Sequence, residues 1–225
     1  MNNDQPISAS SRAKVSLILM PLFVLLFGRL GIELNVRLFP LRYSWIPSII
    51  FYYMMIGLCL IFARSKLNIK IVSGSFFTRT IPKPHYLLIG IILPILPTLA
   101  LFILNLKAVP PIFLVYIFIF AAINPFFEEF FWRGLLNNIP ASRVFRIFYS
   151  SSLFAASHYF LWGSHWLLPA PKWIAAVIST FIMGILWMWF YQKQKNLFYP
   201  ILSHVLVDVF NLGVAIFYGL KLITV

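Results

Sequence analysis

Three of the five acidic side chains in this 225-residue chain lie inside apolar stretches: Glu128, Glu129 and Asp208. An aspartate at the centre of an apolar membrane helix costs about 2.5 to 3.5 kcal/mol. Two of the four histidines, His158 and His204, are placed in the same way. Carboxylates and imidazoles transfer protons and bind metals, so we expect these five side chains to face one another in a polar cavity.

The spacing of the first acidic pair predicts different partners for its two members. Glu129 and Arg133 are four residues apart, so on a helix they share a face in the favourable acid-first order. Glu128 lies about 100° around the helix from Glu129, and so it points to a different side. We therefore predict that Arg133 neutralises Glu129 and leaves Glu128 free to react. The alternative is a structural polar seam between helices that is formed by all three residues.

The two histidines differ in what surrounds them in the sequence. His204 and Asp208 are four residues apart and would share a helix face. Such a pair can share a metal, orient a water, or bond each other, with Asp208 fixing the tautomer of His204. His158 follows two alanines and a serine, which allow close packing of helices. By itself, a histidine of this kind is most often a hydrogen-bonded core residue.

The composition is that of an integral membrane protein. Hydrophobic residues make up 61% of the chain and charged residues 10%, whereas soluble domains carry about 25% charged residues. The apolar runs match the ~20 residues that a helix needs to cross a bilayer. The predicted fold class is therefore all-α, a polytopic transmembrane helical bundle.

Seven or eight spans are predicted in one transmembrane domain over residues 12–225, after a polar tail at 1–11 that we expect to be disordered. The last apolar run contains Gly213 and forms either one long helix or two short ones. The expected spans are 15–28, 44–63, 86–105, 110–136, 144–162, 173–191 and 197–220.

Counting along these spans places Glu128 nearer the inner side of the membrane and His158 nearer the outer side. Proline removes a backbone hydrogen bond and kinks a helix. We expect Asn124-Pro125 to break the fourth span and widen a cavity beside Glu128. Either this break or a tilted fifth helix is needed to bring Glu128 and His158 level.

The net charge of +13 comes from bases at the ends of the apolar runs. More of these bases fall on the inner segments when the N-terminus lies in the cytoplasm, so this orientation is favoured. Because the bases are not gathered in one domain, we expect no nucleic-acid partner; membrane lipids with anionic headgroups are the expected partners. The short loops and the absence of a targeting extension favour a bacterial inner membrane.

Three motifs in this order resemble the CPBP intramembrane protease family, also called the CAAX prenyl protease or abortive-infection family. That family is marked by Glu-Glu-x-x-x-Arg, then Phe-x-x-x-His, then His-x-x-x-Asn or Asp. The resemblance covers about residues 111–213, and the first three spans match only in being hydrophobic. The motifs stand here as Glu128-Glu129-x-x-x-Arg133, Phe154-x-x-x-His158 and His204-x-x-x-Asp208.

The resemblance implies hydrolysis of peptide bonds within the membrane. In the mechanism proposed for the family, Glu128 acts with His158 to activate a water, and His204 and Asp208 hold the oxyanion. The prenyl-protease branch has Asn at the last position, whereas Asp208 can donate a hydrogen bond only when it is protonated. Asp208 can instead orient His204 or ligate a metal.

The need for a metal stays open at this point, because the family has been described both as metal-dependent and as glutamic-type. Two histidines plus a carboxylate suit zinc. The chain has no His-Glu-x-x-His motif, and its single cysteine excludes a Cys-based zinc site. We therefore expect no cofactor, with zinc as the alternative. A metal site would draw on Glu128, His158, His204 and Asp208.

The predicted function is an intramembrane endopeptidase that hydrolyses a membrane-associated protein or peptide. The first alternative is a non-enzymatic membrane immunity or scaffold protein that binds a peptide in the same cavity. The second is an ion or proton transporter that uses the buried acids as a relay. The chain lacks the paired broken helices in matching halves that many transporters show, which argues against this second alternative.

Overall fold

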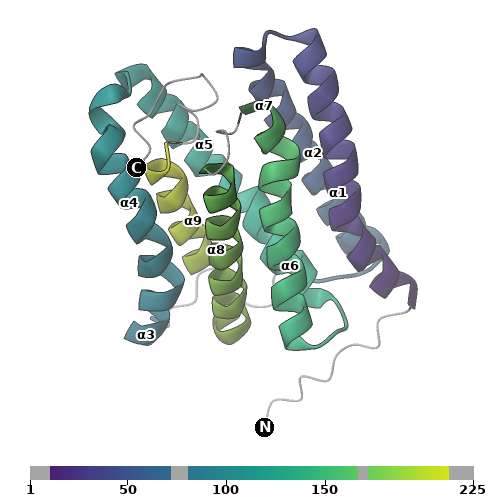
Figure 1. The fold of residues 1–225 in the computed structure, drawn as a ribbon. Coiled ribbons are helices and arrows are strands. Elements are labelled where there is room, and N and C mark those ends of the chain that lie inside the picture. The colour runs from purple at the N-terminus through teal and green to yellow at the C-terminus, as the bar shows by residue number, and fades with distance from the viewer. Residues whose placement is uncertain (1–10, 72–80, 167–171, 213–225) are drawn as a thin grey trace.

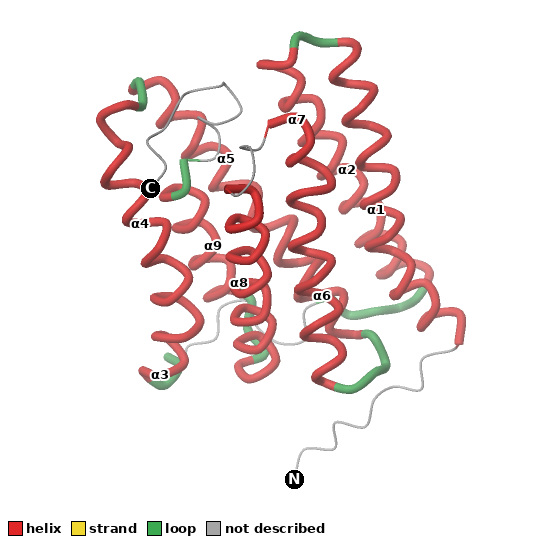
Figure 2. Tube along the Cα trace, in the orientation of Figure 1, coloured by secondary structure: helices red, strands yellow, loops and turns green. Residues whose placement is uncertain are grey.

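The computed structural model describes residues 11–71, 81–166 and 172–212, and every regular element in these ranges is a helix (Figure 1). Figure 2 shows that short connections join the helices at the two ends of one bundle. The α-helices are α1 (Ser11–Leu38), α2 (Leu41–Lys66), α3 (Pro84–Leu87), α4 (Leu93–Asn105), α5 (Pro111–Glu129), α6 (Arg143–Ser157), α7 (Ser164–Trp166), α8 (Lys172–Gln194) and α9 (Phe198–Phe210).

Shorter segments of π- or 3-10 geometry continue several of these helices without a loop. They matter because tightened or widened turns re-aim side chains, and π-helical turns often lie at functional sites. The π-helical segments are η1 (Leu88–Ile92), η3 (Phe130–Leu135) and η5 (His158–Gly163), and the 3-10 segments are η2 (Leu106–Ala108) and η4 (Leu136–Asn138).

Five helices in the described ranges are long and apolar enough to cross a membrane. The predicted class, an all-helical membrane bundle, is thus confirmed, whereas the count of seven or eight spans is not. The apolar helix Phe198–Phe210 is shorter, and the predicted continuation to residue 220 lies outside the described residues, as does most of the 1–11 tail. The five helices are Ser11–Leu38, Leu41–Lys66, Pro84–Ala108, Pro111–Asn138 and Trp173–Gln194.

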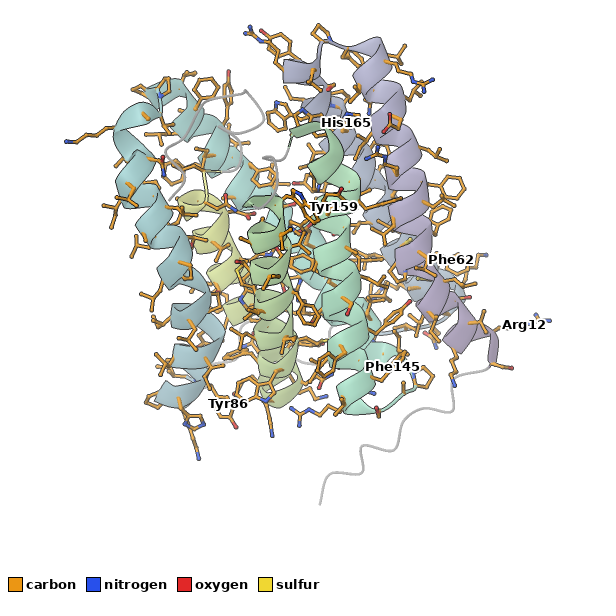
Figure 3. All side chains as sticks on the ribbon, in the orientation of Figure 1. Arg12, Phe62, Tyr86, Phe145, Tyr159 and His165 are labelled. Atoms are coloured by element: carbon orange, nitrogen blue, oxygen red, sulfur yellow. The ribbon has the colours of Figure 1, made fainter. Side chains whose placement is uncertain are left out.

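The outer surface of the bundle is apolar, as expected of helices that face lipid. Figure 3 shows Arg12 and Tyr86 toward the end of the bundle where α1 begins, and His165 at the opposite end. His165 Nε2 lies 2.9 Å from Glu33 Oε1, and Glu33 also pairs with Arg29. Large exposed apolar side chains between these ends include Leu19, Leu26, Leu34, Ile50, Ile61, Ile103, Phe118 and Ile178.

The expected break at Asn124-Pro125 is wrong in its position. The α5 helix stays α-helical through Pro125 to Glu129, and π-geometry begins only at Phe130. Proline can remain inside a membrane helix because neighbouring groups satisfy the freed carbonyl. The change in helix geometry therefore follows the acidic pair instead of preceding it.

Small residues bring pairs of helices into close contact. In α1, a Cβ on Gly31 would lie 2.4 Å from the ring of Phe51 in α2. In η1, a Cβ on Gly90 would lie 2.3 Å from the ring of Phe190 in α8. Such positions let helices approach in a membrane, where burial of apolar surface supplies no driving force.

We expect Gly90→Ala to destabilise the bundle by about 1 to 3 kcal/mol, because Phe190 must move to admit the methyl group. Thermal unfolding of the purified protein in detergent measures the effect. Gly57→Ala is the matched control, because a Cβ there has no heavy atom within 4 Å. Equal unfolding midpoints for the two variants would contradict the tight contact at Gly90.

Candidate active site

The predicted site residues lie where α5 and η3 pass α9 near the middle of the bundle. Glu128 and Glu129 are the last two residues of α5, and their exposed fractions are 2% and 0%. Arg133 follows one turn later in η3 and is 1% exposed. The α9 helix packs along α5 and contributes His204 and Asp208, both buried. The structure therefore brings five of the six predicted residues into one cluster.

The predicted pair between Glu129 and Arg133 is present, with Arg133 Nη1 3.0 Å from Glu129 Oε1. The guanidinium also lies over two aromatic rings, 4.1 Å from the Phe154 centroid and 5.1 Å from that of Trp187. These rings stabilise a desolvated cation. Arg133 is thus held by one carboxylate and two ring faces.

Glu129 has a second partner that the sequence spacing did not predict. His204 Nδ1 lies 2.8 Å from Glu129 Oε1, and an ionised carboxylate can only accept, so Nδ1 donates. The other ring nitrogen, Nε2, lies 3.6 Å from Asp208 Oδ1. The tautomer of His204 is therefore set by Glu129, and the direct His204–Asp208 bond, one of the options left open by the spacing, is too long to form.

Glu128 lacks a helical basic partner, as predicted, but both of its oxygens accept hydrogen bonds. Tyr52 of α2 donates its hydroxyl to Oε1 at 2.8 Å. Asn124 donates its amide to Oε2 at 3.3 Å. His204 Nε2 lies 3.5 Å from the same Oε2. The carboxylate is therefore held by two neutral donors and faces an imidazole beyond hydrogen-bond range.

Asp208 is an acceptor in this arrangement. Its Oδ2 accepts from Asn124 Nδ2 at 3.0 Å, so one amide group links Asp208 to Glu128. Its other oxygen faces His204 Nε2 at 3.6 Å. An amide side chain therefore lies beside Asp208, and it comes from Asn124 of α5.

His158 begins η5 and stands slightly apart from the bonded cluster. Its Nδ1 lies 2.9 Å from the carbonyl oxygen of Phe154, which can only accept, so Nδ1 carries the hydrogen. In the neutral ring, Nε2 is then a free acceptor. The Phe154 ring centroid lies 4.7 Å from that of His158 and 6.0 Å from that of His204. His158 is also in electrostatic range of Glu128, so the expected difference in depth does not separate them.

Sequence reasoning missed the neutral members of the site. Tyr52 and Tyr53 lie in an apolar run that offers no polar pattern, so nothing in the sequence distinguishes them from membrane-interface aromatics. Asn124 was noted only as part of the Asn-Pro pair. Its position, four residues before Glu128 and on the same helix face, is the one signal that could have placed it in the site. Trp187, which stacks on His204 at 4.6 Å, carried no signal either.

No three His, Cys, Asp or Glu side chains in the described residues are placed so that they could hold a metal ion. The zinc alternative at Glu128, His158, His204 and Asp208 stays a prediction.

An apolar groove of about 410 Å³ lies between α1, η5 and α8. It uses the turn that carries His158, but none of the clustered acids or histidines lines it. The lining residues are Leu22, Leu25, Leu26, Ala156, Tyr159, Phe160, Trp173 and Val177.

The comparison with known families agrees with the motifs. Residues 110–210, just under half of the chain, match the family described as type II CAAX prenyl endopeptidase Rce1-like. This segment is therefore similar to the CAAX protease family. The resemblance expected over 111–213 is thereby confirmed. No curated protein and no solved structure matches the chain.

The CAAX protease match runs from the start of α5 to the end of α9 and contains all six predicted site residues. It supports a membrane-embedded protease that acts on a membrane-associated substrate. The α1 and α2 helices, with Tyr52 and Tyr53, lie outside it.

Proposed function

We propose that this protein is an intramembrane endopeptidase in which Glu128 and His158 activate a water molecule. The observation that carries the proposal is the carboxylate of Glu128. It is 2% exposed inside an apolar bundle and, unlike its neighbour Glu129, has no arginine or lysine partner among the described residues, a feature that it shares with Asp208. Burying a carboxylate without a neighbouring cation costs free energy. Such a site suits a carboxyl group that exchanges a proton during the reaction.

In the proposed reaction, Glu128 takes a proton from the water while the water oxygen attacks the peptide carbonyl carbon. His158 Nε2 accepts the other water hydrogen and orients the molecule, because its Nδ1 is committed to the Phe154 carbonyl. The C–N bond then breaks, and protonated Glu128 returns its proton to the leaving amine. The carboxyl group of Glu128 thus acts first as the base and then, once protonated, as the acid.

His204 is proposed as the oxyanion donor. Its Nδ1 is held by Glu129, which aims Nε2 between Glu128 and Asp208 at 3.5 and 3.6 Å. Because Nδ1 donates to Glu129, Nε2 carries a hydrogen only when His204 is an imidazolium, the form that the three neighbouring carboxylates favour. At these distances neither Glu128 nor Asp208 engages that hydrogen, and a preoriented donor of this kind stabilises charge as it develops on the carbonyl oxygen. Asp208 would then act by holding Asn124 through their 3.0 Å bond, and not by donating.

We propose a metal-independent mechanism, because both oxygens of Glu128 and one oxygen of Asp208 accept hydrogen bonds from Tyr52 and Asn124, and because no three His, Cys, Asp or Glu side chains in the described residues are placed to hold a metal ion. Cleavage is accordingly expected to continue at an unchanged rate in a strong zinc chelator. Loss of cleavage in the chelator, with recovery on addition of zinc, would replace this mechanism by a metal-dependent one.

The direct test uses the purified protein in lipid vesicles with quenched fluorescent peptides. The peptides carry a C-terminal prenylated cysteine, an acylated cysteine or no lipid, and mass spectrometry locates the bond cut. Cleavage at a defined bond supports the proposal. Binding of a peptide without cleavage favours the immunity or scaffold alternative, and proton flux across the vesicle membrane favours the transporter.

The proposed setting is a bacterial inner membrane with the N-terminus in the cytoplasm and anionic lipids at the basic ends of the helices. In support, Arg12 lies toward the end of the bundle where α1 begins, and α2 ends with Arg64 and Lys66 in its last turn. Protease accessibility of an N-terminal tag in sealed vesicles tests this orientation.

A further inference from the structure

Two adjacent tyrosines of α2 each begin a chain of hydrogen bonds that ends on Glu128. Tyr52 reaches Oε1 directly, and Tyr53 reaches Oε2 through Asn124. Both tyrosines lie outside the segment that matches the CAAX protease family. Part of the environment of the proposed base therefore comes from a helix that the match does not cover.

The direction of the first chain follows from the chemistry of its members. The indole of Trp132 can only donate, and its Nε1 lies 3.3 Å from the Tyr52 hydroxyl oxygen. The Tyr52 hydrogen is then directed to Glu128 Oε1 at 2.8 Å. Donation from the indole polarises the hydroxyl and strengthens the bond to the carboxylate.

The direction of the second chain is equally determined. The amide nitrogen of Asn124 faces two carboxylates, Glu128 Oε2 at 3.3 Å and Asp208 Oδ2 at 3.0 Å. Its amide oxygen therefore points the other way and accepts from the Tyr53 hydroxyl at 3.1 Å. The hydrogen that Tyr53 donates thus stabilises the orientation of the amide in which its nitrogen faces the acids.

We propose that Tyr52 and Tyr53 are positioning residues that hold the Glu128 carboxylate in one orientation until water and substrate enter. This inference rests on the role proposed above for Glu128. The two groups that donate to Glu128, the Tyr52 hydroxyl and the Asn124 amide, are neutral, so they orient the carboxylate without placing a cation beside it. Tyr53 in turn holds the amide that bridges Glu128 and Asp208.

Several other groups act on Glu128 and are unchanged by substitutions in α2. They are the same in the wild-type protein and in the variants below. From the remaining elements packed around the site these are Glu129, Arg133, His158, His204 and Asp208.

The test is Tyr52→Phe, which keeps the edge contact of the ring with Trp162 at 5.7 Å and removes only the hydroxyl. Loss of the donor leaves one oxygen of the carboxylate free to turn away from the water. We expect kcat for peptide cleavage to fall about tenfold while KM stays within about twofold, because the bond orients the proposed base and does not contact the substrate. Tyr53→Phe keeps the stacking on Phe127 at 4.6 Å and should give a smaller fall in kcat.

A second measurement needs no enzymatic activity. The chain has only three glutamates, Glu33, Glu128 and Glu129, so labelling glutamate with 13C at the carboxyl carbon gives three infrared signals. The signal that disappears in Glu128→Gln is that of Glu128. Its carboxylate stretching frequency should change in Tyr52→Phe, because that frequency depends on the hydrogen bonds that the two oxygens accept.

Tyr116→Phe is the matched control, since it removes a hydroxyl from an exposed tyrosine near the other end of α5 and keeps the ring contact with Phe113. It should change neither kcat nor the infrared frequency of Glu128. An unchanged Glu128 frequency in folded Tyr52→Phe overturns the inference. If the wild-type protein cleaves no peptide, the proposed function fails, while the infrared frequency still decides the role of the tyrosines.

Discussion

Replacement of Glu128 by glutamine is expected to lower peptide cleavage by roughly 10²- to 10⁴-fold while the protein stays folded, because the substitution removes the proposed base. Glutamine keeps the size of the side chain. Its amide oxygen can retain the 2.8 Å bond from Tyr52, so that only the longer 3.3 Å bond from Asn124 is lost. Initial rates of cleavage and equilibrium binding of the same peptide are the two measurements, and binding should be preserved.

Glu33→Gln is the control for this variant, since Glu33 pairs with Arg29 and His165 near the opposite end of α1 from Arg12. It should cleave at the wild-type rate. Wild-type cleavage by Glu128→Gln would remove Glu128 from the mechanism. A biological activity that survives this substitution, in a protein that never cleaves peptides, would favour the non-enzymatic alternative.

Arg133→Ala is expected to destabilise the protein by about 3 to 5 kcal/mol and to lower the yield of folded protein, because it leaves a buried carboxylate without its cation. Glu129 is fully buried, and in the variant only His204 would remain to balance its charge. The loss of cation–π contact with Phe154 and Trp187 adds to the effect. Size-exclusion yield and thermal unfolding in detergent measure it.

The double variant Glu129→Gln with Arg133→Met separates charge balance from catalysis. It removes both charges and keeps apolar contact with the rings, so much of the lost stability should return. Cleavage should not return, because the ionised carboxylate that orients His204 is gone. Normal stability of Arg133→Ala alone would show that the buried ion pair is not needed to balance Glu129.

Sequence spacing was sufficient for relations within one helix. Residues four apart share a face whatever the helix packs against, so the Glu129–Arg133 pair and the common face of His204 and Asp208 were predictable. The membrane class was predictable for a similar reason. An apolar composition excludes a soluble fold regardless of how the helices are arranged.

Relations between helices were decided only by the tertiary structure. Whether Glu129 or Asp208 orients His204 depends on the rotation and depth at which α9 packs on α5, and no local pattern specifies these. The same packing places Tyr52 and Tyr53 of α2 against Glu128 and Asn124. In lipid, close contact and hydrogen bonds between helices decide this arrangement, and both depend on residues far apart in the chain. The sequence by itself therefore determined which residues carry charge into the membrane, and the packing of the helices determined which partner each of them has.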